Sequence, residues 1–420
     1  MLRVFEAFAG YGSQSIALRN LGIEHEVVAI SEIDKYAIKA YEAIHGPTNN
    51  LGDISKINPS DIPDHDLFTY SFPCQDLSVA GKQAGLGKGT RSGLLYECEK
   101  IIEAKKPKYL LLENVKNLVG KKFKPEFNKW LEYLEGLGYT NYWKVLNAKD
   151  YGVPQNRERV FVVSILGEHK PYEFPKAIPL DKCIADILED EVDEKYYINK
   201  PFHLVNKGHQ AELDIKGQDC IKRAYGTDKI APTLTTMQGG MREPKILEDL
   251  DFVGGIGDKD WAGDGKKLSR NYPQGNRVYS DKGIACSQTS NGGGLGGSTG
   301  LYLVNLPCIA ASRGRNPENP SSREAGLPTE QRLEFNTKGT SNTITTVQKD
   351  NYVVERTCRI RKLTPRECFR LMGMRDDDID KIQATGISNT QQYKMAGNSI
   401  VVNVLEAIFG ELFGIKKKDK

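Results

Sequence analysis

The stretch Ser71–Ser78, "SFPCQDLS", decides how the rest of the sequence is interpreted. It overlaps the apolar run "DLFTYSF" (66–72), which is typical of a short buried strand. Cys74 therefore lies directly after a proline, at the predicted end of that strand. A lone cysteine in such a place is most often a small buried thiol. A reactive thiol is the alternative, and it requires other functional groups at the same edge of the sheet.

The first 166 residues alternate between apolar runs typical of strands and amphipathic runs typical of helices. Ser13 is expected to cap the first helix and Gly22 to end it. Residues 398–413 predict one more amphipathic helix. The predicted strands cover residues 2–8, 26–32, 66–72, 108–115 and 159–166. Alternating elements of this kind predict a mainly parallel, Rossmann-like α/β sheet with helices on both sides.

The composition predicts a cytoplasmic protein without a bound metal. The eight cysteines form no Cys-x-x-Cys pair, and the six histidines do not join them at zinc spacing. A reducing compartment without disulfides is therefore favoured. No apolar run approaches the roughly 20 residues of a membrane span, and no signal peptide opens the chain. The net charge of +3 is small, so a surface for nucleic acid has to be local.

Polar and small residues at three successive turns predict a ligand site at the head of the sheet. Gly10 and Gly12 lie where the first predicted strand turns into a helix, and they allow a ligand to approach the backbone closely. Glu32 ends the second strand and is placed to accept hydrogen bonds from two ribose hydroxyls. Asp53 precedes the third strand and can accept a hydrogen bond from an adenine amine. The apolar neighbours of these two acids are Ile33 and Ile54. The ligand expected is an adenosine derivative, either a dinucleotide or S-adenosylmethionine.

Further functional groups converge on the edge that carries Cys74. The fourth predicted strand ends in "ENV", which brings Glu113 and Asn114 to that edge. "QNRERVF" places Arg157 and Arg159 just ahead of the fifth strand. A thiol, a carboxyl group and two guanidinium groups thus meet beside the adenosine site. An ordinary ion pair is the alternative for Glu113 and Arg159, and a phosphate contact or a surface charge is the alternative for Arg157.

This combination suits methylation of a cytosine ring at C5. Unactivated cytosine is a poor nucleophile there, but a thiolate that adds at C6 turns the ring into an enamine, whose C5 attacks an electrophilic methyl group. A carboxyl group that stays partly neutral can protonate or hydrogen-bond N3 as charge builds on it. An arginine can hold the ring oxygen and orient the acid, and nearby arginines lower the pKa of the thiol.

The motifs resemble those of the C5-cytosine DNA methyltransferase family, in their standard order. The stretches that carry the resemblance are "FAGYGSQSIAL", "SEIDKYA", "GDI", "FPCQDLS", "GTRSGLLYE", "LLENVKNL", "LNAKDYGVPQNRERVF", "RKLTPRECFRLMG" and "AGNSIVVNVL". They cover most of residues 1–166 and 361–405. The resemblance implies a catalytic domain (1–185) that binds S-adenosylmethionine. It also implies a smaller, β-rich target-recognition domain (186–375) and a C-terminal segment (376–420) that packs back on the catalytic domain.

The resemblance also implies roles for single residues. Cys74 is expected to be the nucleophile, with Glu113 and Arg159 as its catalytic partners. Residues expected to line the cofactor site are Phe8, Ala9, Gly10, Tyr11, Gly12, Glu32, Ile33, Asp53, Ile54, Pro73, Leu94, Asn398 and Ser399. Residues expected to contact DNA are Ser78 and Arg157 at phosphates, Thr233, Ser287 and Thr343 on the backbone, and Gln288 and Asn291 as candidates to fill the gap left by a flipped base.

The region from 186 to 360 contains a weak repeat. Residues 223–240, 277–294 and 333–350 align, each with a lysine-containing turn, a Thr/Ser-rich strand and a polar or glycine-rich loop. A coincidence of turn-rich β sequence is one interpretation. A repeated scaffold for one recognition surface is another, and a multispecific enzyme with tandem recognition units is a third.

The sequence therefore predicts a sequence-specific DNA (cytosine-5) methyltransferase that acts as a monomer on double-stranded DNA. A role in restriction–modification, with a cognate endonuclease, or in phage DNA protection is expected. The alternatives are an RNA cytosine-5 methyltransferase, a Rossmann-type oxidoreductase and an inactive DNA-binding protein. The oxidoreductase leaves "FPCQ", "ENV" and the paired arginines without a function, and the intact catalytic positions argue against an inactive protein.

Overall fold

The computed structural model divides the chain into two compact units. The first comprises Met1–Leu188, Asp228–Glu243 and Thr364–Lys420, and the second comprises Glu189–Thr227 and Pro244–Leu363. The structure describes residues 1–73, 91–198, 202–205, 210–213, 215, 219–237, 242–249, 252–255, 277–279, 308–315, 330–335, 351–354 and 358–415. The units depart from the predicted boundaries after residues 185 and 375, because Asp228–Glu243 and the residues from Thr364 onward belong to the first unit.

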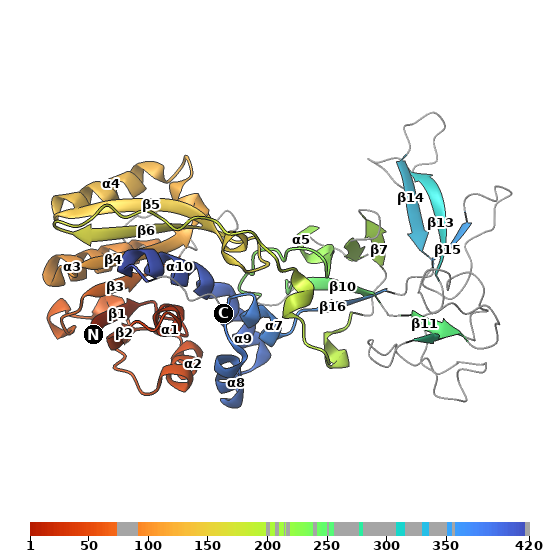
Figure 1. The fold of residues 1–420 in the computed structure, drawn as a ribbon, viewed down its shortest axis with the longest axis horizontal. Helices are drawn as coiled ribbons and strands as arrows, with labels where there is room; N and C mark the ends of the chain where they lie inside the picture. The colour runs from red at the N-terminus through yellow and green to blue at the C-terminus, as the bar shows by residue number, and fades with distance from the viewer. Residues whose placement is uncertain are drawn as a thin grey trace. The chain divides into compact units, whose positions relative to one another are not determined.

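A six-stranded mixed sheet forms the centre of the first unit (Figure 1). Its strands are β1 (Leu2–Ala7), β2 (His25–Ser31), β3 (Leu67–Tyr70), β4 (Tyr109–Val115), β5 (Tyr139–Asn147) and β6 (Glu158–Leu166). The strand order is β2-β1-β3-β4-β6-β5. The first four strands in this order pair in parallel, whereas β6 pairs antiparallel with both β4 and β5. The predicted α/β, Rossmann-like class is confirmed.

The sequence prediction missed β5 (Tyr139–Asn147), and the burial of this strand explains why. β5 lies at the edge of the sheet and pairs only with β6 among the described strands. Most of its side chains are exposed or half-buried, including Trp143, which is 39% exposed. A strand with so little burial carries no continuous apolar run and only a weak alternation, so neither pattern marks it.

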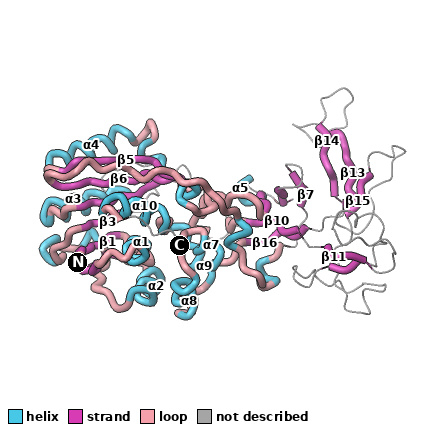
Figure 2. The backbone as a smooth tube through the Cα atoms, viewed as in Figure 1, coloured by secondary structure: helices cyan, strands magenta, loops and turns pink. Residues whose placement is uncertain are grey.

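Helices cover both faces of this sheet, as the cyan and magenta segments in Figure 2 show. The helices of the first unit are α1 (Ser13–Asn20), α2 (Lys35–His45), α3 (Leu95–Lys105), α4 (Lys124–Gly136), α7 (Pro365–Arg370), α8 (Asp376–Ala384), α9 (Asn389–Asn398) and α10 (Val402–Phe413). The predicted cap of α1 is off by one residue. Gly12, with φ of 82°, is the N-cap, and Ser13 is the first helical residue.

The single helix predicted over residues 398–413 is divided in the structure. α9 ends at Asn398, the backbone at Ser399 is extended, and α10 begins at Val402. The stretch Asn389–Phe413 is long and apolar enough to cross a membrane by length and composition alone. However, Val402, Leu405 and Phe409 are buried inside the fold, so α10 is a core helix.

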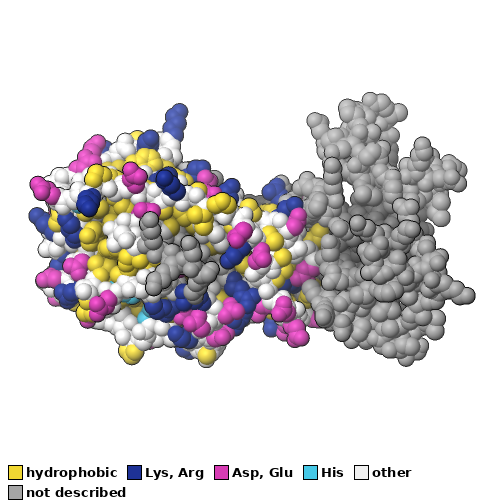
Figure 3. All heavy atoms as spheres, in the orientation of Figure 1, with side chains coloured by type: hydrophobic (Ala, Val, Ile, Leu, Met, Phe, Trp, Pro, Cys, Tyr) yellow, Lys and Arg dark blue, Asp and Glu magenta, His cyan; other side chains and the backbone are white. Residues whose placement is uncertain are grey.

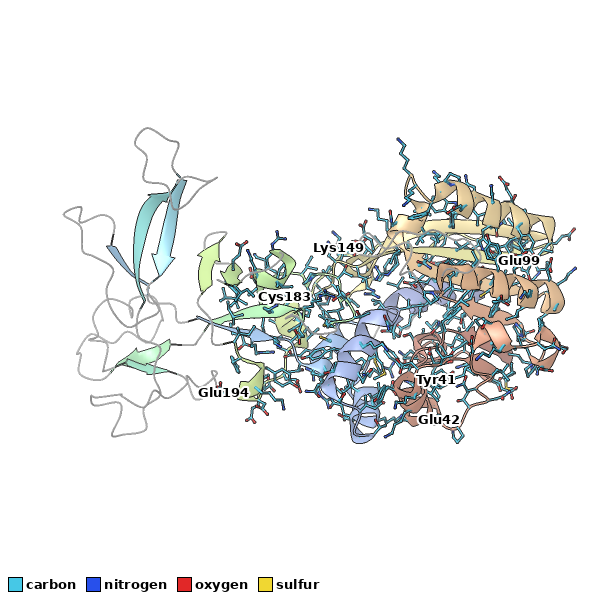
Figure 4. The ribbon with its side chains drawn as sticks, turned by 180° about the vertical axis from the view of Figure 1, so that it is seen from behind. Tyr41, Glu42, Glu99, Lys149, Cys183 and Glu194 are labelled. Carbon is cyan, nitrogen blue, oxygen red and sulfur yellow. The ribbon has the colours of Figure 1, made fainter. Side chains whose placement is uncertain are left out.

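A buried carboxyl group, which the sequence analysis did not single out, lies beneath the turn between β1 and α1. Glu6 in β1 is fully buried. It accepts hydrogen bonds from the hydroxyl of Ser15 (2.8 Å) and from the hydroxyl of Tyr41 (2.9 Å) in α2, which Figure 4 labels. Burial raises the pKa of Glu6 to about 7, although both hydroxyls oppose this rise.

The raised pKa of Glu6 makes stability depend on pH. Between roughly pH 4.5 and 7 the folded protein binds more protons than the unfolded chain, so the free energy of unfolding falls as the pH rises through this range. For one group with this shift the loss is about 3 kcal/mol. We expect Glu6→Gln, which cannot ionise, to flatten this dependence in denaturant titrations at pH 5 and pH 8. Glu42→Gln, at an exposed position beside Tyr41 (Figure 4), is the control and should behave as wild type. A Glu6→Gln protein that keeps the full wild-type dependence would contradict the assignment.

The second unit is rich in β structure, as predicted. Its largest sheet has the order β16-β10-β9-β8-β7, with β7 (Phe202–Val205), β8 (Gln210–Leu213), β9 (Arg223–Gly226), β10 (Lys245–Asp249) and β16 (Cys358–Lys362). A short helix, α5 (Asp219–Lys222), precedes β9. A buried ion pair joins Arg361 to Glu248 across the antiparallel strands β16 and β10. Two further sheets contain β11 (Phe252–Gly255) with β12 (Arg277–Tyr279), and β13 (Cys308–Arg315) with β14 (Glu330–Phe335) and β15 (Asn351–Val354).

Candidate active site

The turn between β1 and α1 has the left-handed backbone that its glycines predict. Phe8, Gly10 and Gly12 have φ values of 57°, 59° and 82°. A Cβ atom on Gly12 would lie 2.4 Å from Nε2 of His45, so glycine is required there by both space and backbone conformation. A Cβ atom on Gly10 would meet nothing within 4 Å. The turn is therefore tightly packed on one side and open on the other, as a ligand-binding turn requires.

Glu32 follows β2 and organises this turn. One of its carboxylate oxygens accepts a hydrogen bond from the backbone N–H of Gly10 (2.9 Å). The other accepts from the N–H groups of Ile33 and Asp34 (2.8 Å each). A carboxylate has about four lone-pair positions, and three are used here, so one further hydrogen bond can come from a ligand. Glu32 thus fixes the position of the glycine turn and keeps acceptor capacity for one hydroxyl group.

Asn50 is a residue of this site that the sequence analysis missed. Its side-chain oxygen accepts from the N–H of Glu32 (3.1 Å), and its amide donates to the carbonyl oxygen of Glu32 (3.1 Å). An isolated parallel bridge pairs Asn50 with Ile30 of β2, so the loop that carries Asp53 begins beside this strand. In the sequence, only two neighbouring asparagines shortly before "GDI" point to this position, and they match no simple motif.

Other predicted cofactor residues differ in their exposure. Asp53 accepts a hydrogen bond from the N–H of Ser55 (3.1 Å) and keeps part of its carboxylate exposed. Ile33 is 74% exposed, which is unusual for a large apolar side chain beside a carboxylate. Ile54 is buried, Leu94 is half-buried and Asn398 is exposed. The exposed apolar side chain of Ile33, next to the Glu32 carboxylate, fits the base and sugar of an adenosine derivative.

Tyr11 and Ser399 join the turn to the break between α9 and α10. The hydroxyl of Ser399 donates to the phenolic oxygen of Tyr11 (2.7 Å). Tyr11 is almost fully buried, and its ring packs edge-on against Phe369 (5.6 Å between ring centres). Residues separated by almost the whole chain, in the first and last family-like motifs, are thus in direct contact.

Glu113 and Arg159 meet at the ends of β4 and β6. Nε of Arg159 lies 3.2 Å from Oε1 of Glu113, and both side chains are largely buried. Burial raises the pKa of Glu113, while Arg159 and then Arg157 oppose the rise. The carboxyl group is therefore held closer to its neutral form than an exposed glutamate would be. This is the state that the sequence analysis required of a proton donor.

Asn114 connects this pair to the strand that precedes Cys74. Its side-chain amide donates to the carbonyl oxygen of Phe72 (3.1 Å), and the group is buried. Phe72 and Pro73 follow β3, the immediate neighbour of β4. Cys74 itself and Ser78 lie outside the described residues. Pro73 is the last described residue before the cysteine. It directly follows Phe72, whose carbonyl oxygen accepts the hydrogen bond from Asn114 in β4.

Two residues predicted to contact DNA are engaged elsewhere. Arg157 is 3% exposed, and its guanidinium group donates to the backbone carbonyl oxygens of Leu234, Gly397 and Ser399. This burial corrects the expected phosphate contact, because the guanidinium is enclosed by protein. The hydroxyl of Thr233 donates to the carbonyl oxygen of Asn156 (2.5 Å) and is not directed to a backbone phosphate as a donor.

Comparison with known proteins agrees with this arrangement. A family model described as C-5 cytosine-specific DNA methylase matches residues 2–414. The chain belongs to this family. The predicted family and the predicted DNA methyltransferase activity are thereby confirmed, and the alternative of an oxidoreductase is wrong.

Relatives of this methyltransferase cover nearly its whole length. The type II methyltransferase M2.ScrFI of Lactococcus lactis subsp. cremoris is 35% identical, over 98% of this chain and 99% of that protein. The orphan methyltransferase M.SPBetaI of Bacillus phage SPbeta is 32% identical, over 98% and 97%. A solved methyltransferase structure from Entamoeba histolytica aligns with a TM-score of 0.59 at 17% identity, over 99% and 98% of the two chains, which shows the fold alone.

The other DNA contacts predicted for the methyltransferase lie outside the described residues. These residues are Ser287, Gln288, Asn291 and Thr343, and the second and third copies of the repeat fall largely in the same regions. Over the visible face of the first unit in Figure 3, the coloured acidic and basic side chains are intermingled. This distribution agrees with the small net charge.

The central position of Glu32 leads to a prediction for cofactor binding. We expect Glu32→Ala to weaken binding of S-adenosylmethionine about 100-fold, because each hydrogen bond to a charged group contributes about 1.5–3 kcal/mol. DNA affinity should change far less. Titration calorimetry with cofactor and a filter-binding assay with DNA measure the two effects. Glu26→Ala, at an exposed position of β2, is the matched control and should bind cofactor as wild type. Equal loss of both affinities would mean that the substitution unfolds the first unit.

Proposed function

We propose that this methyltransferase uses S-adenosylmethionine to methylate C5 of cytosine within a specific sequence of duplex DNA. The observation that carries the proposal is the buried Glu113–Arg159 pair, at the end of the strand that anchors Phe72 ahead of Cys74. An ordinary surface ion pair would leave the glutamate fully ionised. Burial instead favours the neutral acid, as protonation of a cytosine ring requires.

Several residues fit the adenosine part of the cofactor. Glu32 keeps acceptor capacity for a ribose hydroxyl, and exposed Ile33 offers an apolar surface to the adenine ring. Asp53 is placed to accept from the exocyclic amine. The open side of Gly10 leaves room for a ligand close to the backbone. When bound, S-adenosylmethionine supplies an electrophilic methyl group.

The chain's own residues activate the cytosine. The Cys74 thiolate adds to C6, and the Glu113 carboxyl group gives its proton to N3 as charge develops there. Arg159 holds the carboxyl group of Glu113 in place and can donate to the ring oxygen. After C5 has gained the methyl group, a base removes the C5 proton, the thiolate leaves from C6 and N3 returns its proton to the Glu113 carboxylate. The cysteine and the acid are thereby restored.

The target cytosine has to leave the base stack, because a thiolate cannot reach C6 inside a duplex. We assign the reading of the flanking bases to the β-rich second unit, and the filling of the vacated space to Gln288 or Asn291. A monomer suffices, since one flipped base needs one active site. The relatives include type II and orphan phage enzymes, so we place this chain in restriction–modification or phage DNA protection, in the bacterial cytoplasm, with a cognate endonuclease as a possible partner.

Methylation of a random-sequence DNA library tests this function. The protein is incubated with the library and S-adenosylmethionine, and bisulfite sequencing identifies the protected cytosines. A single protected motif supports one recognition surface on a repeated scaffold. Two or more unrelated motifs support tandem recognition units. Protection that ignores sequence, or none at all with folded, cofactor-bound protein, would overturn the proposal.

A further inference from the structure

Residues 231–237, which belong to the first copy of the predicted repeat, are hydrogen-bonded into the first unit. The N–H of Ala231 donates to the carbonyl oxygen of Pro154 (2.7 Å), and the N–H of Asn156 donates to the carbonyl oxygen of Ala231 (2.8 Å). A parallel bridge pairs Gln155 with Ala231. Ala231 at the start of this segment therefore lies beside the residues that lead into β6. We refer to residues 231–237 as the 231–237 segment.

Side chains of the "QNR" motif strengthen this attachment. The side-chain oxygen of Gln155 accepts from the N–H of Leu234 (3.2 Å), while its amide donates to the carbonyl oxygen of Leu371 (2.6 Å). The hydroxyl of Thr233 donates to the carbonyl oxygen of Asn156 (2.5 Å). Gln155, Leu234 and Ala231 are at most 1% exposed. Together these hydrogen bonds fix the backbone position of the segment against the residues before β6.

Arg157 lies at the centre of the arrangement. Its Nη1 donates to the carbonyl oxygen of Leu234 (2.9 Å) in the 231–237 segment. Its Nη2 donates to the carbonyl oxygens of Gly397 (3.1 Å) and Ser399 (2.7 Å) at the break between α9 and α10. We call Arg157 with these three carbonyl groups the Arg157 cluster. One rigid, planar guanidinium thus joins three chain segments, which a flexible lysine cannot do in the same geometry.

The Arg157 cluster is linked to both halves of the reaction site, by a hydrogen bond on one side and through the chain on the other. On one side, Ser399 donates from its hydroxyl to Tyr11 in the cofactor turn (2.7 Å). On the other side, Arg159 follows two residues later and pairs with Glu113. Gly397 packs so tightly on the 231–237 segment that a Cβ atom there would lie 1.9 Å from the carbonyl oxygen of Thr235.

We propose that Arg157 is a positioning residue, and that the 231–237 segment is a structural part of the catalytic unit rather than a recognition module. The inference rests on the proposed roles of Ser399 and Glu113. Arg157 touches neither DNA nor cofactor in this assignment. It holds the Ser399 backbone under the cofactor turn and holds the start of β6, which carries Arg159. The 231–237 segment then sets how well every target is methylated, and not which target is chosen.

Arg157→Lys and Arg157→Met separate geometry from charge. Both lose the three-carbonyl arrangement, so we expect the KM for S-adenosylmethionine to rise and kcat to fall, each by about ten-fold. The set of methylated motifs in the random DNA library should stay the same. Because the positive charge of Arg157 lowers the pKa of Glu113, its loss in Arg157→Met should move the alkaline limb of the pH–rate profile to higher pH. Arg157→Lys keeps the charge, so this limb should stay in place.

Arg370→Lys is the matched control. Arg370 also donates to two backbone carbonyl groups, those of Ile187 (3.1 Å) and Leu188 (2.9 Å), and neither carbonyl belongs to the Arg157 cluster. Its loss should lower thermal stability without changing the KM for S-adenosylmethionine. Thr233→Val tests the same idea if the Arg157 variants fail to fold. It removes one hydroxyl contact and should raise that KM about three-fold, with unchanged motifs.

Two outcomes would overturn the inference. One is selective loss or change of a methylated motif in the Arg157 or Thr233 variants, because this would make the segment part of target recognition. The other is wild-type KM and kcat in folded Arg157→Lys and Arg157→Met. Both outcomes are judged against unaltered protein in the same library experiment. Failure of the unaltered protein to methylate any motif would count against the proposed function, whereas a change confined to the variants bears on this inference.

Discussion

Replacing Cys74 with serine is expected to abolish methyl transfer while cofactor binding persists. A serine hydroxyl is far less acidic than a thiol, so almost no alkoxide forms near neutral pH and addition to C6 fails. Loss of a catalytic nucleophile costs on the order of 10⁴-fold or more in rate. Transfer of a radioactive methyl group to target DNA measures the rate. Calorimetry with S-adenosylmethionine should give nearly wild-type affinity, because the cofactor is assigned to the Gly10 turn and Glu32.

Covalent trapping identifies the thiol directly. If the target cytosine carries fluorine at C5, there is no proton to remove after methylation, so the thiolate cannot be expelled and protein and DNA remain joined. The wild-type protein should form this adduct, and Cys74→Ser should not. Cys183→Ser is the matched control, because Cys183 lies at the N-cap position of the short helix Ile184–Ile187, where serine is a favourable residue. Figure 4 labels Cys183. Trapping by Cys74→Ser, or loss of cofactor affinity in it, would contradict the assigned role.

The parts of the fold that could be predicted from sequence are those with strong local patterns. β1 to β4 and β6 are buried apolar runs, and each lies within a residue or two of its predicted range. α2 is capped by the Asp34 side chain and ends before Gly46, as standard helix signals predict. Where burial is one-sided or absent, as in β5, the sequence carries no such pattern and the prediction failed.

The candidate site was predictable where a motif supplies the functional atom, and unpredictable where a tertiary contact does. Glu32 and Glu113 lie at strand ends, and a carboxyl group there can be predicted to accept hydrogen bonds or to donate a proton. Asn50 can hydrogen-bond to Glu32 only because its segment pairs with β2 in the folded protein, and no local sequence pattern reveals this pairing. Arg157 illustrates the opposite error. Its position in the family-like motif suggests a phosphate contact, but three backbone carbonyl groups from distant segments accept hydrogen bonds from its guanidinium.

Glu113→Gln is expected to lower kcat by about 10²- to 10⁴-fold, the usual contribution of a general acid. Glutamine keeps the size of the side chain and can still donate a hydrogen bond, but it has no proton to transfer to N3. In the wild-type protein, the raised pKa of Glu113 keeps the acid protonated to higher pH than an exposed carboxyl group would be. Activity should therefore fall as the pH rises through that pKa, and this alkaline limb should disappear in Glu113→Gln.

The neighbouring Glu158 supplies the control for this prediction. Glu158→Gln makes the same chemical change one residue from Arg159, but it breaks an exposed ion pair with Lys116 (2.9 Å), of a kind that contributes at most about 1 kcal/mol. Its kcat and pH profile should match the wild type. If Glu113→Gln retained kcat within about three-fold and kept the alkaline limb, another group would have to protonate the ring, and the buried pair would be structural. If both variants lost activity equally, the charge at the start of β6, and not the acid at N3, would be what catalysis requires.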